Sequence, residues 1–243
     1  MNLLIIGGAG FIGANLVLHW LCNHLDDVFI KVVALTYAGN LENLEELKTH
    51  PNYRFVLGNL QNPLYISTAF SEHNVEAFIH LAVESDVDRS IHGPADFIAI
   101  NITGTFNLLE ATQKFWDADL SAHRFLHVST DKVYGSLGSD GKFLENTAYA
   151  PNSPYSSSKE ASDHLVRAWH HTYNMNVVTT NCSSNYLQNL PIPVYGDGKN
   201  IIDWLFVEDH CEALDRDFFM KVTPEKCTTL AVPTNGAILT LFV

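Results

Sequence analysis

The chain has 243 residues, 47% hydrophobic and 17% charged, so it can bury a sizeable core and is globular rather than disordered. A formal net charge of −13 argues against nucleic acid or an anionic membrane surface as a partner. The twelve histidines are scattered and the four cysteines lie far apart, so we expect no metal site and reduced thiols in a cytoplasmic protein.

The first predicted unit is a strand, a tight turn and a helix. Residues 3–6 are apolar without a break, and residues 11–21 carry apolar side chains at helical spacing. Between them the glycines fit G-x-G-x-x-G at Gly8, Gly10 and Gly13, and G-x-x-G-x-x-G at Gly7, Gly10 and Gly13. Such a turn lets a diphosphate approach the backbone at a helix N-terminus, so the stretch predicts a dinucleotide site; a glycine-rich turn that binds nothing is the alternative.

The rest of the chain continues the alternation of strands and helices to about residue 180. Apolar, β-branched runs predict strands at 29–35, 53–57, 77–81, 124–129 and 177–180. Apolar residues at helical spacing predict helices at 41–47, 63–73, 95–116 and 156–173. This alternation predicts an α/β fold, a Rossmann-type doubly wound parallel sheet whose ligands bind beyond the carboxyl ends of the strands.

Two segments carry candidate chemistry, 129–135 directly after a strand and 155–159 at the start of a helix. Tyr155 and Lys159 are four residues apart and therefore share one helical face. A nearby ammonium would favour the phenolate and lower the tyrosine pKa, which makes the tyrosine a plausible base towards a substrate hydroxyl. A surface tyrosine and lysine spaced by chance is the alternative.

Several further segments carry a resemblance to a known family. They are GGAGFIG (7–13), LTYAGNLENL (35–44), HLAVESDVDRSI (80–91), NITGTFNLLEA (101–111), HVSTDKVYGSLG (127–138), YAPNSPYSSSKEASDHLVRAWHHTY (149–173), TNCSSNY (180–186), PVYGDG (193–198) and DWLFVEDH (203–210). In this order the chain resembles the extended short-chain dehydrogenase/reductases and, within them, the dTDP-glucose 4,6-dehydratases. The match covers most of residues 1 to 214.

The resemblance implies a lyase that oxidises the sugar at C4, eliminates water across C5 and C6 and returns the hydride to C6. Tyr155 would be the base, and Lys159 would tune it and hold the nicotinamide ribose. Thr130 would touch the 4-hydroxyl region, and Asp131 would protonate the leaving 6-hydroxyl. Lys132 stands where the family has the glutamate that takes the C5 proton.

The resemblance also implies NAD as the cofactor and dTDP-glucose as the substrate. The residues expected to bind NAD are Gly7, Gly10, Phe11, Ile12, Gly13, Thr36, Asn59, Leu60, Leu81, Ala82, Ser85, Tyr155, Lys159 and Asn185. The residues expected to bind the substrate are Glu84, Thr130, Ser184, Pro193 and Tyr195. A homodimer is expected through helices 95–116 and 156–173.

Departures from the family pattern fall on polar positions. A cation at Lys132 cannot accept a proton unless burial lowers its pKa far. Val33 replaces a ribose-binding acid, and Ile202 replaces an arginine that serves the substrate diphosphate. We expect a NAD-binding domain at 1–181 and a truncated sugar-nucleotide part at 182–243.

Three other functions stay open beside the dehydratase. The chain could be a non-catalytic remnant of such an enzyme, or a partner of an intact homologue. It could also be a sugar-nucleotide 4-epimerase or dehydrogenase, which would need only Tyr155, Lys159 and NAD and would tolerate Lys132.

Overall fold

A computed structural model describes residues 1–33, 41–58, 60–136, 143–144, 146–182, 206–219, 227–231 and 239–240. Of these, residues 32–33, 41–43, 57, 227–231 and 239–240 are described by their backbone alone. The strands are β1 (Asn2–Ile6), β2 (Val28–Val33), β3 (Tyr53–Leu57), β4 (Ala77–His80), β5 (Arg124–Thr130), β6 (Val177–Cys182), β7 (Cys227–Ala231) and β8 (Leu239–Thr240). The α-helices are α1 (Phe11–Asn23), α2 (Pro63–His73), α3 (Val87–His92), α4 (Pro94–Phe97), α5 (Thr105–Phe115), α6 (Pro154–Tyr173) and α7 (Val207–Phe219). Two 3-10 helices, η1 (Leu41–Thr49) and η3 (Asp131–Tyr134), and one π-helical segment, η2 (Ile98–Gly104), complete the described elements.

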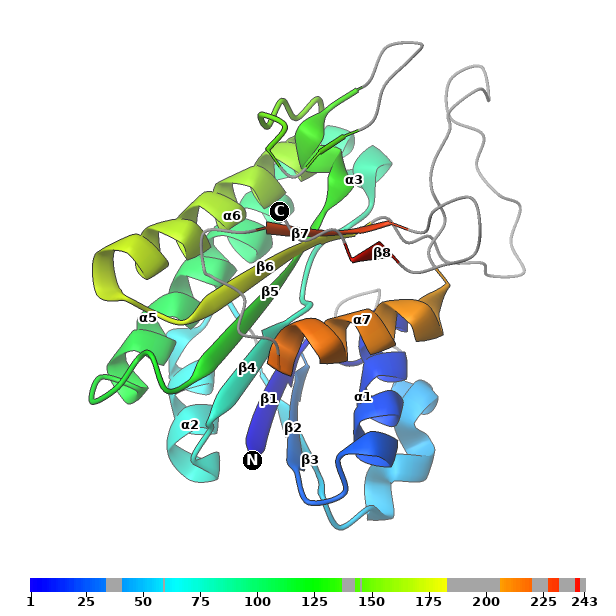
Figure 1. The fold of residues 1–243 in the computed structure, drawn as a ribbon, viewed down its shortest axis with the longest axis vertical. Coiled ribbons are helices and arrows are strands. Elements are labelled where there is room, and N and C mark those ends of the chain that lie inside the picture. The colour runs from blue at the N-terminus through cyan, green and yellow to red at the C-terminus, as the bar shows by residue number, and fades with distance from the viewer. Residues whose placement is uncertain are drawn as a thin grey trace.

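All eight strands form one sheet in the order β3-β2-β1-β4-β5-β6-β7-β8 (Figure 1). Strands β1 to β7 run parallel, and β8 is antiparallel to β7. The predicted doubly wound parallel sheet is therefore confirmed, and β7 and β8 extend it beyond the six predicted strands. The strand order reverses between β1 and β4, where an open α/β sheet offers a crevice for a ligand.

Helices cover both faces of the sheet (Figure 1). On one face α1 and α7 bury apolar side chains against β1 and β2, with Trp20 fully buried in that cluster. On the other face α2, α5 and α6 pack over the sheet around Phe78, Leu108 and Phe125. The strands are apolar on both sides because both faces are covered, which is why they read as continuous apolar runs in the sequence.

The prediction of one regular helix over residues 95–116 is wrong. The chain instead runs through α4, the π-helical η2 and α5. Within η2, buried Asn101 accepts a hydrogen bond from Glu84 N at 2.9 Å and donates to Ser158 Oγ at 2.8 Å. A π-helical turn changes the direction of its side chains relative to a regular helix, and such turns are frequent at functional sites. Here the turn accompanies contacts from Asn101 to two other segments, which periodicity along the chain does not reveal.

Helix α7 packs on α1 through polar and aromatic contacts. Asp215 lies 3.1 Å from His19 Nε2 and 2.9 Å from His24 Nε2. The ring of Trp20 meets Phe218 edge-on, with centroids 5.0 Å apart. Since β7 also pairs with β6, the described elements after residue 181 join the same sheet and its helical layer. The division into two domains at residue 181 stays a prediction, and none of the described helices is long and apolar enough to cross a membrane.

Candidate active site

The glycine turn after β1 brings three backbone segments together. Gly7 has a φ of +87°, and a Cβ at this residue would lie 2.5 Å from Ala82 N. A Cβ at Gly13 would collide with Gly7 O, so any side chain there would push α1 away from the turn. At Gly10 the nearest neighbour of such an atom would be Gly7 O at 3.4 Å. The turn therefore has no room for a side chain at Gly7 or Gly13, whereas a Cβ at Gly10 would make only an ordinary contact.

This shape fits a dinucleotide. Helix α1 begins at Phe11, and no side chain caps its N-terminus at Gly10. The backbone N–H groups of its first turn are therefore available to an anion such as a diphosphate. Phe11 and Ile12 are half-buried at the same helix end. The residues present are those that a pyrophosphate requires, namely glycines where the backbone must come close and a helix start without a competing side chain.

The remaining described residues of the expected NAD site lie along the same edge of the sheet. Leu81 N donates to Ile6 O at 2.8 Å, which places Leu81 and Ala82 beside the turn after β1. Leu60 is buried against Gly104, and Ser85 is exposed. The other expected NAD-binding residues lie outside the described residues: Thr36, Asn59 and Asn185. So do three of the expected substrate-binding residues: Ser184, Pro193 and Tyr195.

Helix α6 presents Tyr155 and Lys159 to the end of β5. The helix begins with a capping box in which Ser153 accepts a hydrogen bond from Ser156 N. Tyr155 hydrogen bonds with Thr130, the last residue of β5. Lys159 donates from Nζ to Val128 O at 2.9 Å. The structure therefore brings together three of the five predicted catalytic residues, Thr130, Tyr155 and Lys159.

The pKa of Tyr155 differs from the sequence-based prediction. Burial raises it above the ordinary value, and the hydrogen bond with Thr130 opposes the rise. The sequence predicts that Lys159 lowers this pKa, but the Lys159 ammonium donates to a carbonyl of β5, and burial lowers the pKa of Lys159 as well. The free chain consequently holds Tyr155 as a neutral phenol, which can donate a proton more readily than accept one.

Asp131 and Lys132 follow Thr130 in η3 and are both partly exposed. Thr130 Oγ1 caps this turn by accepting a hydrogen bond from Lys132 N at 3.3 Å, and it also donates to Asp131 Oδ1 at 3.2 Å. Lys132 Nζ lies 3.9 Å from Asp131 Oδ1. The two side chains therefore form an ion pair.

Glu84 is buried and held from two sides. Its backbone N–H donates to Asn101 Oδ1 at 2.9 Å, while Arg89 Nη1 donates to Glu84 Oε2 at 3.1 Å. Burial raises the pKa of Glu84, and Arg89 opposes the rise. Asn101 also bonds to Ser158 on α6, so the loop after β4 is tied to the helix that carries Tyr155.

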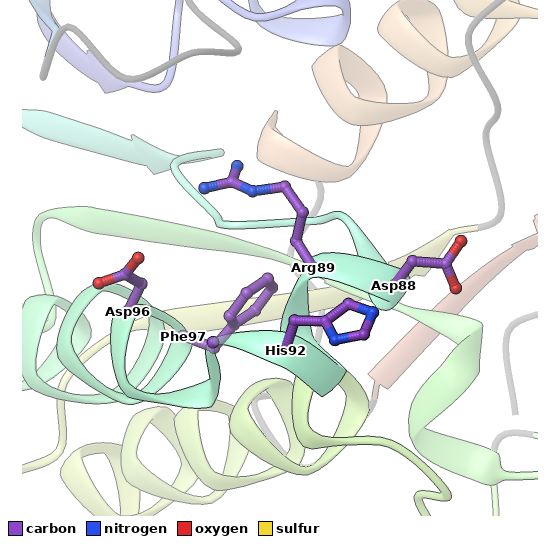
Figure 2. Close-up of a pocket in the computed structure, with 6 residues that line it drawn as sticks. Asp88, Arg89, His92, Asp96 and Phe97 are labelled. Carbon is purple, nitrogen blue, oxygen red and sulfur yellow. The ribbon is translucent and has the colours of Figure 1, made fainter.

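A pocket of about 360 Å³ opens at the junction of α3 and α4 and is lined by Asp88, Arg89, His92, Gly93, Asp96 and Phe97 (Figure 2). Asp88 and Asp96 lie at opposite sides of it, so its acidic groups do not converge on one point. Arg89 connects the pocket to Glu84, and the Phe97 ring lies 6.3 Å from the ring of Tyr155. The pocket therefore adjoins two residues of the candidate site, Glu84 and Tyr155.

Sequence reasoning missed a buried polar group beneath Lys159. Asp163 accepts hydrogen bonds from His127 Nε2 at 3.0 Å and from Ser129 Oγ at 2.7 Å. The available signal was the spacing on α6, since Asp163 follows Lys159 by four residues and Tyr155 by eight. Those positions share one helical face, and a carboxylate on a buried face needs partners.

Comparison with known proteins gives a consistent result. Residues 4–189 match the family model described as GDP-mannose 4,6 dehydratase. A dTDP-glucose 4,6-dehydratase of Xanthomonas campestris pv. campestris (strain B100) is 50% identical, over 87% of this chain and 66% of the relative. The enzyme of the same name from Neisseria meningitidis serogroup B is 48% identical, over 88% of this chain and 66% of the relative. The chain thus spans just under two thirds of the length of these relatives.

Solved structures agree with the sequence relatives. The dTDP-glucose 4,6-dehydratase of Bacillus anthracis, crystallised with NAD, is 38% identical with a TM-score of 0.83, covering 98% of this chain and 77% of that one. DesIV of Streptomyces venezuelae, a dTDP-glucose 4,6-dehydratase with NAD and TYD bound, is 34% identical with a TM-score of 0.86, covering 99% and 77%. Together with the glycine turn and the Thr130–Tyr155–Lys159 site, these matches show that the chain belongs to the dTDP-glucose 4,6-dehydratase family of short-chain dehydrogenase/reductases.

Proposed function

We propose that this chain binds NAD and dTDP-glucose and oxidises the sugar at C4, which is the first stage of the family reaction. The observation that carries the proposal is the meeting of Tyr155, Thr130 and Lys159 at the carboxyl end of β5. This group lies on the same sheet edge as the glycine turn, which fits a dinucleotide. Family membership and the NAD-bound relatives support the choice of cofactor.

Each stage of C4 oxidation has a candidate residue. When bound, NAD supplies the acceptor for the C4 hydride. Tyr155, once deprotonated, takes the proton of the sugar 4-hydroxyl, and Thr130 orients that hydroxyl through its own Oγ1. Lys159 provides a positive charge beneath the site, bonded to the carbonyl of Val128. The glycine turn holds the diphosphate of the cofactor on backbone N–H groups.

The second stage lacks its base in this chain. Elimination across C5 and C6 needs an acceptor for the C5 proton and a donor for the leaving 6-hydroxyl. Lys132 stands at the base position, 3.9 Å from Asp131 Oδ1, and its ammonium group has no lone pair with which to accept that proton. We therefore propose that the reaction stops after oxidation at C4.

The test uses the purified chain with NAD and dTDP-glucose. Absorbance of reduced nicotinamide should rise when the sugar nucleotide is added, and dTDP without the sugar should give no rise. Thr130→Val, which keeps the shape but removes the hydroxyl, should slow the rise. If dTDP-glucose produces no reduced nicotinamide at any enzyme concentration, the proposal fails; formation of dTDP-galactose would instead favour the 4-epimerase.

We also propose that the chain forms a homodimer through residues 95–116 and 156–173. Large apolar side chains on this surface are exposed, among them Ile98, Phe106 and Tyr173. Phe106 packs on Trp169 with ring centroids 5.9 Å apart, so α5 and α6 form one continuous surface. Light scattering coupled to gel filtration should give twice the chain mass, and Phe106→Glu should give the monomer.

A cytoplasmic location is proposed on the state of the thiols. Within the described part of the chain, Cys22, Cys182 and Cys211 are free. Free cysteines are typical of proteins in a reducing compartment. Fractionation of the source cells would check this directly.

A further inference from the structure

Two side chains of helix α6 form hydrogen bonds with three consecutive residues of β5. Lys159 bonds to the carbonyl of Val128 at 2.9 Å. One turn further along the helix, Asp163 bonds to the side chains of the two neighbours, His127 at 3.0 Å and Ser129 at 2.7 Å. All of these contacts are buried. The register of α6 on β5 is therefore fixed by two polar side chains below Tyr155.

The protonation of this group can be assigned. Burial lowers the pKa of His127 well below its ordinary value, so the ring is neutral. Its Nδ1 has no hydrogen-bond partner among the described residues, whereas its Nε2 faces Asp163. Burial raises the pKa of Asp163 to about 6, so its carboxylate form prevails above that pH. A carboxylate accepts hydrogen bonds only, so this form places the ring proton on Nε2. Ser129 Oγ completes a second hydrogen bond to that same charged form.

Asp163 lies one helical turn beyond Lys159 on α6, and both side chains are buried against β5. The charge of Asp163 raises the pKa of Lys159, against the opposing effect of burial. Cys182 faces the ammonium too, but burial raises the pKa of that thiol to about 12, so it is neutral. The titratable groups that face Lys159 or Asp163 from the packed elements are His80 of β4, His127 of β5, Cys182 of β6, Tyr149 and, on α6 itself, Tyr155 and His164. Burial raises the pKa of Tyr155, and the charge of Asp163 raises it further.

We propose that Asp163 is a positioning residue whose buried carboxylate keeps Lys159 as an ammonium ion and holds α6 in register on β5, so that the Tyr155 hydroxyl stays beside Thr130. Without this carboxylate the Lys159 cation would be buried with no opposite charge, which a buried ammonium avoids by losing its proton. The consequence for deprotonation of Tyr155 rests on the proposed function. The charge relation between Asp163 and Lys159 does not.

The experiment follows the charge of Lys159 directly by NMR on the full chain grown with [13Cε]lysine. The chain has nine lysines, and Lys159→Arg identifies the signal by its loss. In Asp163→Asn, which keeps the shape, the midpoint of the Lys159 titration should move to lower pH by about one unit or more, since an opposite charge nearby shifts a pKa by that order. Glu160→Gln is the matched control, because it removes a carboxylate from the same helix that is 3.7 Å from His164 instead. In Glu160→Gln the midpoint of the Lys159 titration should be the same as in the parent.

Ser129→Ala provides a second variant that keeps the carboxylate. It removes one hydrogen bond to the charged form of Asp163, so the Lys159 midpoint should move in the same direction by a smaller amount; if Asp163→Asn does not fold, this variant decides. An unchanged midpoint in the folded variant, or a shift equal to that of Glu160→Gln, would overturn the proposal. The titration needs no nucleotide. A shifted midpoint in a chain that does not reduce NAD would uphold this inference and refute the proposed function.

Discussion

Tyr155 shows how one side chain sets the conditions for the proposed chemistry. Its hydroxyl is hydrogen-bonded to Thr130, yet burial raises its pKa above the ordinary value. A base with a raised pKa is charged in only a small fraction of molecules near neutral pH. The fraction grows tenfold per pH unit until the pKa is reached, so the rate of a step that needs the phenolate should follow it.

The rate of C4 oxidation should therefore rise with pH from neutral into the alkaline range. Tyr155→Phe should lower that rate by about 10²-fold or more, because general base catalysis contributes about 10²–10⁴-fold. The affinity of the Tyr155→Phe variant for NADH, measured by fluorescence, should stay within a factor of a few of that of the parent. A flat pH profile in the parent, or an active phenylalanine variant, would remove Tyr155 from the role of base.

At the scale of elements, the first βαβ unit carries residues expected to contact the dinucleotide. Gly7 and Gly13 close the turn and Gly10 leaves it open. The residue at the end of β2 is Val33, which offers no hydrogen bond to a ribose 2′-hydroxyl. The cation in this strand is Lys31, whose buried stem passes Gly8 and whose Nζ lies 5.8 Å from the centre of the Phe55 ring. Burial lowers the pKa of Lys31 to about 8.

We expect calorimetry to give tighter binding of NAD than of NADP, with modest affinity for both. The missing charge-assisted hydrogen bond at Val33 costs about 1.5–3 kcal/mol. The ammonium group of Lys31 lies over the Phe55 ring. Lys31→Met should leave the preference unchanged. Tighter binding of NADP that disappears in this variant would show that Lys31 reads the 2′-position.

The elements also show what the sequence could and could not reveal. The strand at Tyr53–Leu57 and the helix at Pro63–His73 were predicted with the observed bounds, because their apolar periodicity is local. The π-helical η2 was missed, since Asn101 contacts residues far away in sequence. The pair of His127 and Asp163 was missed for the same reason: it depends on how α6 lies on β5.

At the scale of the whole molecule, α7 completes a helical layer on one face of the sheet, but it buries a carboxyl group whose ionisation destabilises the fold. Asp217 is fully buried in this helix, and neither carboxylate oxygen has a hydrogen-bond partner among the described residues. Burial raises its pKa from 3.8 to about 6. The protonated form is therefore favoured in the folded chain, and ionisation of Asp217 works against folding.

Because the folded pKa is the higher one, the contribution of Asp217 to stability is fully present below about pH 4 and is lost as the pH rises through about 6. The loss is about 3 kcal/mol at about 1.4 kcal/mol per pKa unit. Asp217→Asn removes the charge, so its advantage in melting temperature over the parent should grow between pH 4 and pH 7. Glu208→Gln, at an exposed position of α7, should show no such trend. An equal difference at both pH values would mean that Asp217 does not titrate as described.

The central claim is that this molecule carries the oxidation half of the family reaction and not the elimination half. The most direct measurement is product analysis of dTDP-glucose incubated with NAD and the chain, beside Lys132→Glu as the variant that restores the family residue. The account predicts reduced nicotinamide and no 4-keto-6-deoxy sugar from the parent. It also predicts no rescue by Lys132→Glu alone, because Ile202 still stands where the family has an arginine. Turnover of dTDP-glucose to the 4-keto-6-deoxy product by the parent chain would contradict it.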